Sequence, residues 1–256
     1  MTAARNEPPV ALRRLLPSHG VVTADEAAGE LDFAEQAGPS RPYVALNMVA
    51  TVDGRASVEG RTASLSSVAD RQVFHALRTR VDAVMVGAGT LRTERYGRLV
   101  RDPHRREQRV AVGLAADPLA IVVSGRLDLP PDLPLLQDAA SSVVIVTASE
   151  ASLEGCAAQV DYLRSSPLDL PAALATLRAE HGVRSMLCEG GPTLNASLLG
   201  QGLIDELFLT TVSKVAGGAG ALTIVGPAPL GEPVAAGLLW LLECDGELFA
   251  RYRVRG

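Results

Sequence analysis

The sequence predicts an α/β protein built in three layers (α/β/α), with helices on both faces of a mostly parallel central sheet. From residue 43 to about residue 215, short apolar runs typical of strands alternate with segments of helical periodicity. This order favours parallel strands joined by crossover helices. Several runs are apolar at nearly every position, as strands covered on both faces are. Near the end, Asp245-Gly246 separates two alternating segments and predicts an antiparallel C-terminal hairpin.

Composition and charge exclude several classes of protein. The chain has 256 residues, of which 47% are apolar, and this suits one large α/β domain. A net charge of −5 argues against a general nucleic-acid binder. No apolar run approaches the roughly 18–20 residues of a membrane helix, and the N-terminus lacks an apolar signal region. The 3 cysteines and 4 histidines show no metal-binding spacing. We therefore expect a cytoplasmic protein without a metal site and without a membrane or nucleic-acid partner.

Residues 1–40 are rich in Pro and Ala and predict an arm that packs on the main domain, which we place at residues 41–256. One short helix is expected in the arm. It begins at Thr23, whose Thr-Ala-Asp-Glu pattern forms a capping box with Glu26. We find no residues in the arm that suggest chemistry.

The main domain opens with the buried strand YVALNMVAT (43–51), followed by a polar loop and a helix near 67–80. The strand DAVMVGAGT then ends in a glycine turn, and an arginine-rich loop runs to about residue 109. Later elements follow in the same alternation: strands LAIVVSG and SVVIVTA, a helix capped by Asp169, the strand VRSMLCE, a helix from Pro192 and the strand ELFLTTVSKV.

Polar or glycine-rich corners follow four of the predicted strands: Ala50–Gly54, Gly87–Thr90, Ser124-Gly125 and Glu189–Gly191. Because parallel strands end at a shared edge where ligands collect, we expect a binding site there. VGAGT lacks the full GxGxxG spacing, and no acidic residue ends a clear second strand, so a conventional Rossmann site is poorly supported. There is also no nucleophile elbow that would indicate a hydrolase.

The stretch Glu189-Gly190-Gly191-Pro192 predicts a strand end, a tight turn and an exposed helix N-terminus, because Pro is tolerated at the first helical position. Such a terminus offers free N–H groups and partial positive charge to an anion such as a phosphate. Glu189 would point into the same crevice. A plain structural turn is the alternative interpretation.

Seven arginines lie between residues 92 and 109 of this otherwise acidic chain. Most charged runs are solvated loops, but a cationic field beside two glycine turns suits phosphorylated ligands, including the 2′-phosphate of NADP(H). The arginines are Arg92, Arg95, Arg98, Arg101, Arg105, Arg106 and Arg109.

Three segments, NMVATVDGRAS, FHALRTRVDAVMVGAGTLRTERYG and CEGGPTLNASLLGQGLIDELFLTTVSKVAGG, together resemble the pyrimidine reductase family of riboflavin biosynthesis. The resemblance spans roughly residues 41–255. It implies a dihydrofolate-reductase-like fold, NADPH as cofactor and a homodimer. In many bacteria this reductase is the C-terminal half of a bifunctional deaminase/reductase, and the absence of the deaminase motifs here suggests a free-standing reductase.

The resemblance also implies the reaction and its residues. NADPH would reduce the ribosylamino group of 5-amino-6-(5-phosphoribosylamino)uracil to an open ribitylamino chain. An acid is needed as the sugar ring opens, and Asp53 and Glu189 are the two candidates. The implied substrate contacts are Asn47, Thr62, Arg78, Arg98, Arg101 and Glu189. The implied cofactor contacts are Val49, Ser64, Gly87, Gly89, Thr90, Glu94, Ser124, Gly190, Gly191, Pro192, Thr193, Leu194, Asn195, Ala196 and Ser197.

Three positions depart from the family pattern. Asn47 stands where bacterial bifunctional enzymes commonly have a lysine, Glu94 where they have an aspartate, and Arg95-Tyr96 where they have Asn-Pro. These departures keep two alternatives open: a related reductase of a pterin such as dihydrofolate, and a non-catalytic nucleotide-binding relative.

Overall fold

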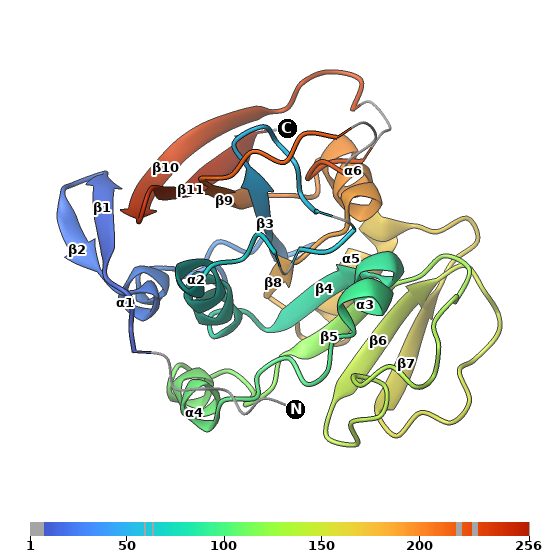
Figure 1. Ribbon diagram of the computed structural model, residues 1–256. Coiled ribbons are helices and arrows are strands. Elements are labelled where there is room, and N and C mark those ends of the chain that lie inside the picture. Colours follow the sequence, from blue (N-terminus) through green and yellow to red (C-terminus); the bar gives the residue numbers. More distant parts are fainter. Residues whose placement is uncertain (1–7, 59, 63, 219–221, 227–229, 256) are drawn as a thin grey trace.

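The computed structural model describes residues 8–58, 60–62, 64–218, 222–226 and 230–255. Its centre is an 11-stranded sheet in the order β2-β1-β10-β11-β9-β3-β8-β4-β5-β6-β7, which crosses the molecule from β2 on the left of Figure 1 to β7 at the lower right. The strands are β1 Leu12–Leu16, β2 Gly20–Val22, β3 Tyr43–Thr51, β4 Ala83–Gly87, β5 Leu119–Val123, β6 Ser142–Thr147, β7 Gln159–Arg164, β8 Ser185–Cys188, β9 Glu206–Val212, β10 Ala235–Cys244 and β11 Glu247–Arg255.

The sheet has a parallel part and an antiparallel part. From β9 through β3 and β8 to β7 all neighbouring strands are parallel, and from β2 to β9 all are antiparallel. The terminal hairpin turns at Asp245 and Gly246, which have φ of 49° and 80°, and Cys244 pairs with Glu247. The predicted fold class, including the C-terminal hairpin, is confirmed.

Helices lie on both faces of the sheet. One apolar cluster joins α1, α2 and α3 to one face, and a second joins α5 and α6 to the other. The helices are α1 Ala24–Gly29, α2 Val68–Arg78, α3 Ala88–Glu94, α4 Pro103–Ala111, α5 Leu170–Ala179 and α6 Pro192–Gly200. The expected caps at Thr23 and Asp169 are both present, the first as a complete capping box with Glu26.

The segment before residue 40 contributes more to the sheet than an arm would. β1 pairs with β10, and β2 pairs with β1, so residues 12–22 form one edge of the sheet. The strands escaped prediction because LRRLL carries two charged residues. Arg13 is exposed and pairs with Glu243 on β10 at 2.9 Å, which is how a charge is accommodated near a sheet edge.

The arginine-rich segment is not the continuous loop that the sequence suggested. It holds α3 and α4, and α4 begins with Asp102 as N-cap and Pro103 at its first turn. Those two residues are a start signal that a sequence can show. The high density of charge obscured it, because the helix has few apolar residues from which to read a period.

Candidate functional site

The corners that follow β3, β8, β4 and β5 lie side by side, and we call this the carboxyl edge. β8 lies between β3 and β4, so the turn after Cys188 separates the ends of two neighbouring strands. Gly87 N–H donates to the Gly190 carbonyl at 2.7 Å, which ties the end of β4 directly to the glycine turn. The expected convergence of these corners is therefore present.

Two helices begin at the carboxyl edge with glycine N-caps. Gly87 caps α3 and Gly191 caps α6, and neither helix has a side-chain cap. The two starts are in contact, because a Cβ on Gly191 would lie 2.7 Å from Thr90 Oγ1. Gly190 has φ of +87°, a conformation that favours glycine. The turn therefore brings the start of α6 against the Thr90 side chain in the first turn of α3, and N–H groups at such a helix start are donors that an anion site can use.

Only part of the expected cofactor stretch faces outward. Thr193 is exposed and Ala196 and Ser197 are half-buried, whereas Leu194 lies in the core cluster of α5 and α6. Asn195 is completely buried. Its amide donates to the Ile224 carbonyl at 2.6 Å. The Asn195 side chain thus holds residues 222–226 against α6 and is not open to a ligand.

Glu189 and Arg78 form a buried ion pair at this edge. Arg78 Nε and Nη2 each donate to one Glu189 oxygen at 2.7 Å, and Nη1 donates to the Leu99 carbonyl at 2.6 Å. The Arg78 side chain is 7% exposed and the Glu189 side chain is 2% exposed. The sequence assigned both residues to the substrate separately. The structure brings them together, and Arg78 is occupied by the protein rather than free to hold a phosphate.

Two aromatic rings flank the Arg78 guanidinium. Its carbon lies 4.2 Å from the Phe74 ring centre and 5.4 Å from that of Tyr96, distances typical of cation–π contacts. Burial, followed by the negative charge of Glu189, raises the pKa of Tyr96 well above its usual value. Sequence reasoning noted Tyr96 only as a departure from the family pattern and missed Phe74.

Asn47 lies beside Glu189. β3 and β8 pair with Leu46 opposite Cys188, so the next residues along, Asn47 and Glu189, are neighbours. Because side chains alternate along a strand, Asn47 shares the face of Ala45, which packs in the cluster of α2. Val49 lies two residues further on the same face. Asn47 and Glu189 therefore occupy neighbouring positions on the α2 face of the sheet at the carboxyl edge.

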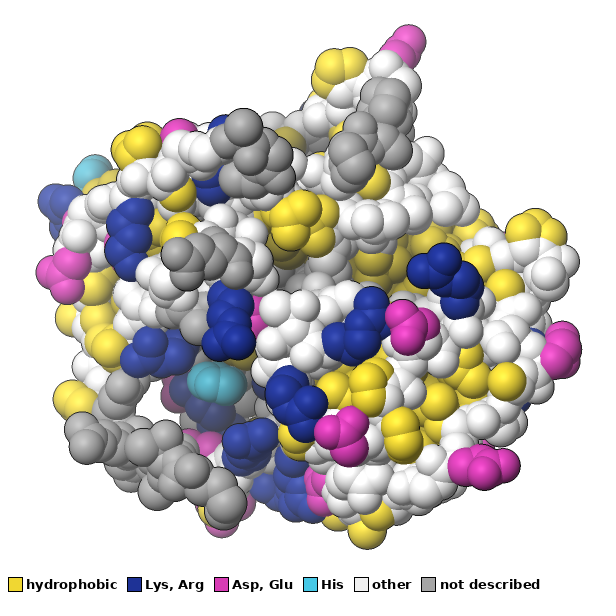
Figure 2. Space-filling model, turned by 45° about the vertical axis from the view of Figure 1, so that its right-hand side comes forward, with side chains coloured by type: hydrophobic (Ala, Val, Ile, Leu, Met, Phe, Trp, Pro, Cys, Tyr) yellow, Lys and Arg dark blue, Asp and Glu magenta, His cyan; other side chains and the backbone are white. Residues whose placement is uncertain are grey.

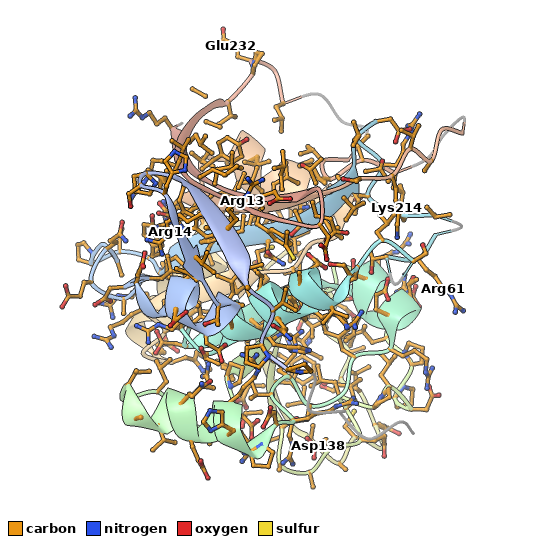
Figure 3. All side chains as sticks on the ribbon, turned by 60° about the vertical axis from the view of Figure 1, so that its left-hand side comes forward. Arg13, Arg14, Arg61, Asp138, Lys214 and Glu232 are labelled. Carbon is orange, nitrogen blue, oxygen red and sulfur yellow. The ribbon has the colours of Figure 1, made fainter. Side chains whose placement is uncertain are left out.

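The loop after β3 is fastened to its surroundings. Thr62 N–H and hydroxyl both donate to Glu94 Oε1, at 3.1 and 2.8 Å, so two expected ligand contacts bind one another. Lys214 Nζ donates to the Ser64 carbonyl at 2.7 Å. Figure 3 shows Lys214 and Arg61 at the same end of the molecule, on neighbouring loops.

Asp53 is held as an ionised carboxylate in the turn after β3. It accepts hydrogen bonds from Thr51 Oγ1 at 2.6 Å and from the N–H groups of Gly217 and Ala216 at 2.7 and 3.1 Å. These bonds, led by that of Thr51, lower the pKa of Asp53 to about 2. A carboxyl with this pKa carries no proton at neutral pH, so the geometry argues against Asp53 as the acid.

The arginine-rich segment is largely neutralised by partners that are distant in sequence. On the face shown in Figure 2, the Lys and Arg side chains stand among Asp and Glu side chains. The ion pairs are Arg92–Asp128, Arg95–Asp132, Arg98–Asp138, Arg105–Asp25 and Arg106–Asp117. Arg109 is fully buried and donates to the carbonyls of Arg78, Val81 and Ala115.

This pairing overturns the expected cationic field. Within the described parts of the chain, no carboxylate contacts Arg101, which is exposed and whose guanidinium lies against Gly97. Of the three arginines expected at the substrate phosphate, Arg78 and Arg98 have carboxylate partners. Arg101 keeps its charge available for a ligand.

Ser124 follows β5 at the carboxyl edge, where it is buried. Its N–H donates to the Val146 carbonyl at 2.9 Å. Gly89, in the first turn of α3, is exposed, and a Cβ there would meet no atom within 4 Å. The first turn of α3 is therefore open to solvent at Gly89.

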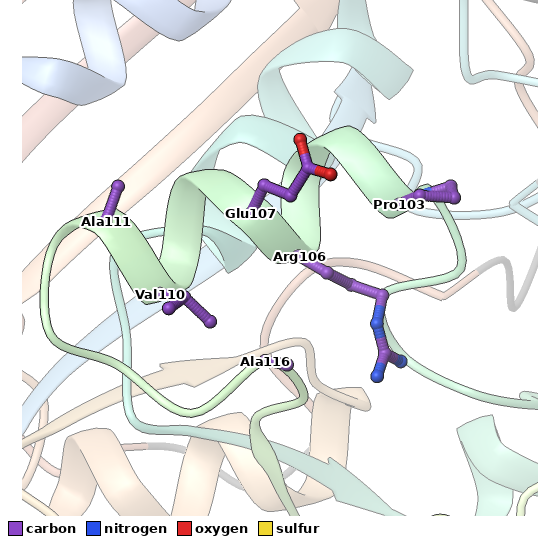
Figure 4. Close-up of a pocket in the computed structure, with 6 residues that line it drawn as sticks. All are labelled: Pro103, Arg106, Glu107, Val110, Ala111 and Ala116. Atoms are coloured by element: carbon purple, nitrogen blue, oxygen red, sulfur yellow. The ribbon is translucent and has the colours of Figure 1, made fainter.

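A shallow depression elsewhere on the surface has a different character. It lies along α4 and is lined by Pro103, Arg106, Glu107, Val110, Ala111 and Ala116 (Figure 4). None of these residues belongs to the carboxyl edge, and the depression contains no cluster of polar groups aimed at a ligand. Across the described residues, no group of three His, Cys, Asp or Glu side chains could hold a metal ion. No helix of the described residues is long and apolar enough to cross a membrane.

The fold and the site define an α/β protein in which a glycine turn at a helix start and a buried carboxylate meet at the carboxyl end of a mostly parallel sheet. The family model described as RibD C-terminal domain matches residues 42–242. The chain belongs to that family.

Several known proteins are similar to this chain. It is 32% identical over 224 residues to the 2,5-diamino-6-ribosylamino-4(3H)-pyrimidinone 5′-phosphate reductase of Methanothermobacter thermautotrophicus, covering 84% of this chain and 100% of the relative. The protein of the same name from Archaeoglobus fulgidus is 32% identical, covering 82% of this chain and 90% of the relative. The solved pyrimidine reductase-like protein of Corynebacterium diphtheriae has the same fold, with a TM-score of 0.77 at 22% identity, covering 92% of this chain and 100% of that one.

Proposed function

We propose that the chain is an NADPH-dependent reductase that converts a ribosylaminopyrimidine 5′-phosphate into its ribitylamino product in riboflavin biosynthesis. The observation that supports this most is that two helices with glycine N-caps begin beside the buried Glu189–Arg78 pair at one sheet edge. Two relatives that this chain covers almost completely are named as reductases of such a phosphate.

The residues at the carboxyl edge suit a dinucleotide cofactor. The glycine-capped start of α6, and the open space over Gly89 at the start of α3, leave N–H groups and room for a pyrophosphate. Gly191, Pro192 and Thr193 would hold it from α6, and Thr90 from α3. From there Ser124 lies toward β5, and Val49 lies toward the substrate side at β3. When bound, NADPH supplies the hydride that reduces C1′ of the substrate.

The chain's own residues orient the substrate. Asn47 and Glu189 lie together beneath α2, so an amide and a carboxylate can hydrogen-bond the polar edge of a pyrimidine. Arg101 is the arginine we assign to the ribosyl phosphate, since Arg98 is paired with Asp138 at 2.8 Å. Asp53 fastens Ala216 and Gly217 to the turn after β3 and holds no proton to give at neutral pH. We assign Glu189 to binding the substrate as an acceptor rather than to protonating it.

The substrate itself has two candidates. The resemblance in sequence implied the deaminated uracil compound, whereas the two archaeal relatives are named for the 2,5-diamino pyrimidinone. Their coverage favours the undeaminated compound. The two substrates differ in the group at C2, where the uracil has a carbonyl and the diamino compound an amino group that a carboxylate can accept from.

The experiment is the oxidation of NADPH followed at 340 nm with each pyrimidine phosphate and with dihydrofolate. We expect turnover with one or both pyrimidines and none with dihydrofolate. Turnover of dihydrofolate alone would favour the pterin reductase, and NADPH binding without turnover of any substrate would favour the non-catalytic relative.

The preference for NADPH over NADH, the homodimer and the cytoplasmic location belong to the same proposal. Because five arginines of the segment are paired with carboxylates, they no longer support selection of the 2′-phosphate by a cationic segment. Calorimetry with NADPH and NADH measures the preference directly, and equal affinities would remove it. Light scattering measures the mass of the particle in solution, which for a dimer is twice the 26.7 kDa of the chain.

A further inference from the structure

The proposed reduction needs a proton as well as a hydride. When C1′ takes up the hydride, the bond between C1′ and the ring oxygen breaks, and that oxygen has to be protonated. Neither acid candidate from the sequence suits this step. Asp53 carries no proton at neutral pH. Arg78 donates to both oxygens of Glu189, which favours the charged form of that carboxylate. The step therefore calls for a different acid.

Three acidic residues are buried in the described parts of the chain, and Asp70 is the one that the proposed function has not used. Glu189 and Glu206 are both paired with arginine. Among the described residues no Lys, Arg or His forms an ion pair with Asp70, and the Ser66 hydroxyl donates to its Oδ2 at 2.5 Å. Burial without a paired cation favours the neutral form of a carboxyl group. Asp70 is therefore the buried acid best able to carry a proton.

Capping of α2 leaves the Asp70 carboxyl unused. Ser67 and Asp70 have the spacing of a capping box, in which the acidic side chain returns to the N-cap N–H. In α1 both bonds of such a box are present, between Thr23 and Glu26. In α2 the Ser67 hydroxyl accepts from the Asp70 N–H at 3.0 Å, but the Asp70 carboxyl is bonded to Ser66 instead. The carboxyl is thus buried for a reason other than capping.

The start of α2 lies over the carboxyl edge. The Ser67 hydroxyl donates to Glu247 Oε2 at 2.6 Å, and the residue after Glu247 pairs with Thr211 near the end of β9. On the other side, Thr62 accepts from the N–H groups of the two residues before Ser67 at 2.8 and 3.3 Å. Thr62 also donates twice to Glu94 of α3. The start of α2 is therefore fastened between the end of β9 and α3.

Strand register shows that α2 runs back along β3. Thr211, beside the start of α2, pairs with Ala50 of β3. Arg78, at the other end of α2, reaches Glu189, which is level with Asn47. The helix therefore passes from the level of Ala50 toward the level of Asn47, over the part of β3 that faces the candidate site.

Asp70 lies on the side of α2 that faces the sheet. Val73 and Leu77 follow it at helical spacing, and both pack in the cluster beneath the helix. Asp70 is three residues from the Ser67 cap, a rise of about 4.5 Å in an α-helix, which brings it near the level of Val49. In the proposed function Val49 is where the cofactor meets the substrate. C1′ has to lie at that point, and the ring oxygen is bonded to C1′.

We propose that Asp70 is the catalytic residue that gives its proton to the ring oxygen of the substrate. This inference rests on the proposed function. C1′ accepts the hydride with its electron pair and gains a C–H bond. The bond between C1′ and the ring oxygen breaks, its electron pair goes to the oxygen, and the oxygen takes the proton of Asp70 to become a hydroxyl of the ribityl chain. NADP⁺ and the Asp70 carboxylate remain, and water returns a proton to the carboxylate.

Four ionisable side chains surround the start of α2. Arg71 is on the helix itself, Glu247 is bonded to Ser67, and Glu94 is bonded to Thr62. Lys214 Nζ donates to the carbonyl of residue 64 at 2.7 Å. Burial raises the pKa of Asp70, while hydrogen bonding, first from the Ser66 hydroxyl, and the charge of Arg71 lower it. The Ser66 hydroxyl is therefore a handle on the titration of Asp70.

The test begins with Asp70→Asn, which keeps the shape of the side chain and removes its proton. Because a general acid contributes about 10²–10⁴-fold, kcat should fall about a hundredfold or more while the Kd of NADPH stays near the wild-type value. The matched control is Glu247→Gln, which changes the other carboxylate at the start of α2 and should keep the wild-type kcat. In Ser66→Ala the carboxylate loses a donor, so Asp70 should stay protonated to higher pH. The fall of kcat at high pH should then move upward in Ser66→Ala and be absent in Asp70→Asn.

Near wild-type kcat in Asp70→Asn, an equal loss in Glu247→Gln, or an unmoved profile in Ser66→Ala would overturn the inference and leave the proposed function standing. A second measurement does not depend on turnover. The ¹³C signal of the Asp70 carboxyl, assigned through Asp70→Asn, should titrate above the ordinary pKa of aspartate, and titration at or below that pKa would also overturn it. If wild type reduces neither pyrimidine, the proposed function fails and the inference falls with it, an outcome that wild type alone reveals.

Discussion

Replacing Glu189 by Gln should be costly even though the two side chains have almost the same shape. The substitution removes the negative charge opposite Arg78 and leaves the Arg78 guanidinium without its carboxylate partner. The site is buried, since the Arg78 side chain is 7% exposed and the Glu189 side chain 2% exposed. Removing one partner of a buried ion pair costs about 3–5 kcal/mol, because the other charge stays buried without compensation. We expect Glu189→Gln to lose stability by this amount.

The loss can be expressed as a melting temperature. For 256 residues, an unfolding entropy of about 2.1 cal/mol/K per residue gives ~0.5 kcal/mol/K, so the Tm should fall by about 6–9 °C. Urea denaturation and calorimetry measure both quantities. The matched control is Glu206→Gln, which removes a second buried carboxylate, paired with Arg251 at 2.7 Å and Arg253 at 3.3 Å, and should lose at least a similar amount.

The two variants should differ in activity. Measured well below both melting temperatures, Glu189→Gln should lose at least about tenfold in kcat/KM, or ~1.4 kcal/mol, while Glu206→Gln keeps nearly the wild-type value. Unchanged turnover in Glu189→Gln, or an equal loss in both variants, would refute the assignment of Glu189 to the substrate. Unchanged stability would refute the argument from the buried pair.

Other outcomes follow from single contacts. Cys188 is buried, and burial raises the pKa of its thiol to about 12. It should therefore react with thiol reagents only after unfolding, while Cys156 and Cys244 react in the native protein. Mass spectrometry of labelled peptides measures the reaction, and rapid labelling of Cys188 in the native protein would contradict the prediction. Hydrogen bonds lower the pKa of Asp53 to about 2. The stability that its charged form contributes is therefore complete above the ordinary pKa of Asp and is lost as the pH falls through about 2. Asp53→Asn should flatten the acid side of the curve of unfolding free energy against pH, and an unaltered curve would count against the hydrogen bonds around Asp53. Asn195→Ala leaves the Ile224 carbonyl without its donor and should lower the free energy of unfolding by about 1–3 kcal/mol. Hydrogen exchange in residues 222–226 should be faster than in wild type. Unchanged exchange there would show that the segment is held by other contacts.

The parts of the fold that the sequence predicted depend on local signals. The capping box at Thr23, the Asp169 cap and the Asp245-Gly246 hairpin each involve residues a few positions apart. The strands of the parallel part can be predicted from their apolar composition, because both of their faces are covered. β1 was missed because its place in the sheet is decided by pairing with β10, more than 200 residues further along the chain.

The candidate site was only partly predictable for the same reason. The glycine turn at Gly190 and Gly191 is a local feature, and its place at a helix start was foreseen. The pairing of Arg78 with Glu189 joins residues 111 positions apart, and that of Arg98 with Asp138 joins residues 40 positions apart. Charge counted along the sequence therefore suggested a cationic field where the fold brings carboxylates to five of the seven arginines.

Isotope labelling follows the hydride from the cofactor to C1′ of the substrate. The protein is mixed with NADPH carrying deuterium at C4 of the nicotinamide, in each stereochemical position in turn, and with a ribosylaminopyrimidine 5′-phosphate. The product is then examined by mass spectrometry and NMR. The account predicts a ribitylamino product with one deuterium at C1′ from one of the two labelled cofactors and none from the other. A product without deuterium at C1′ from either cofactor, or no ribitylamino product at all, would contradict it.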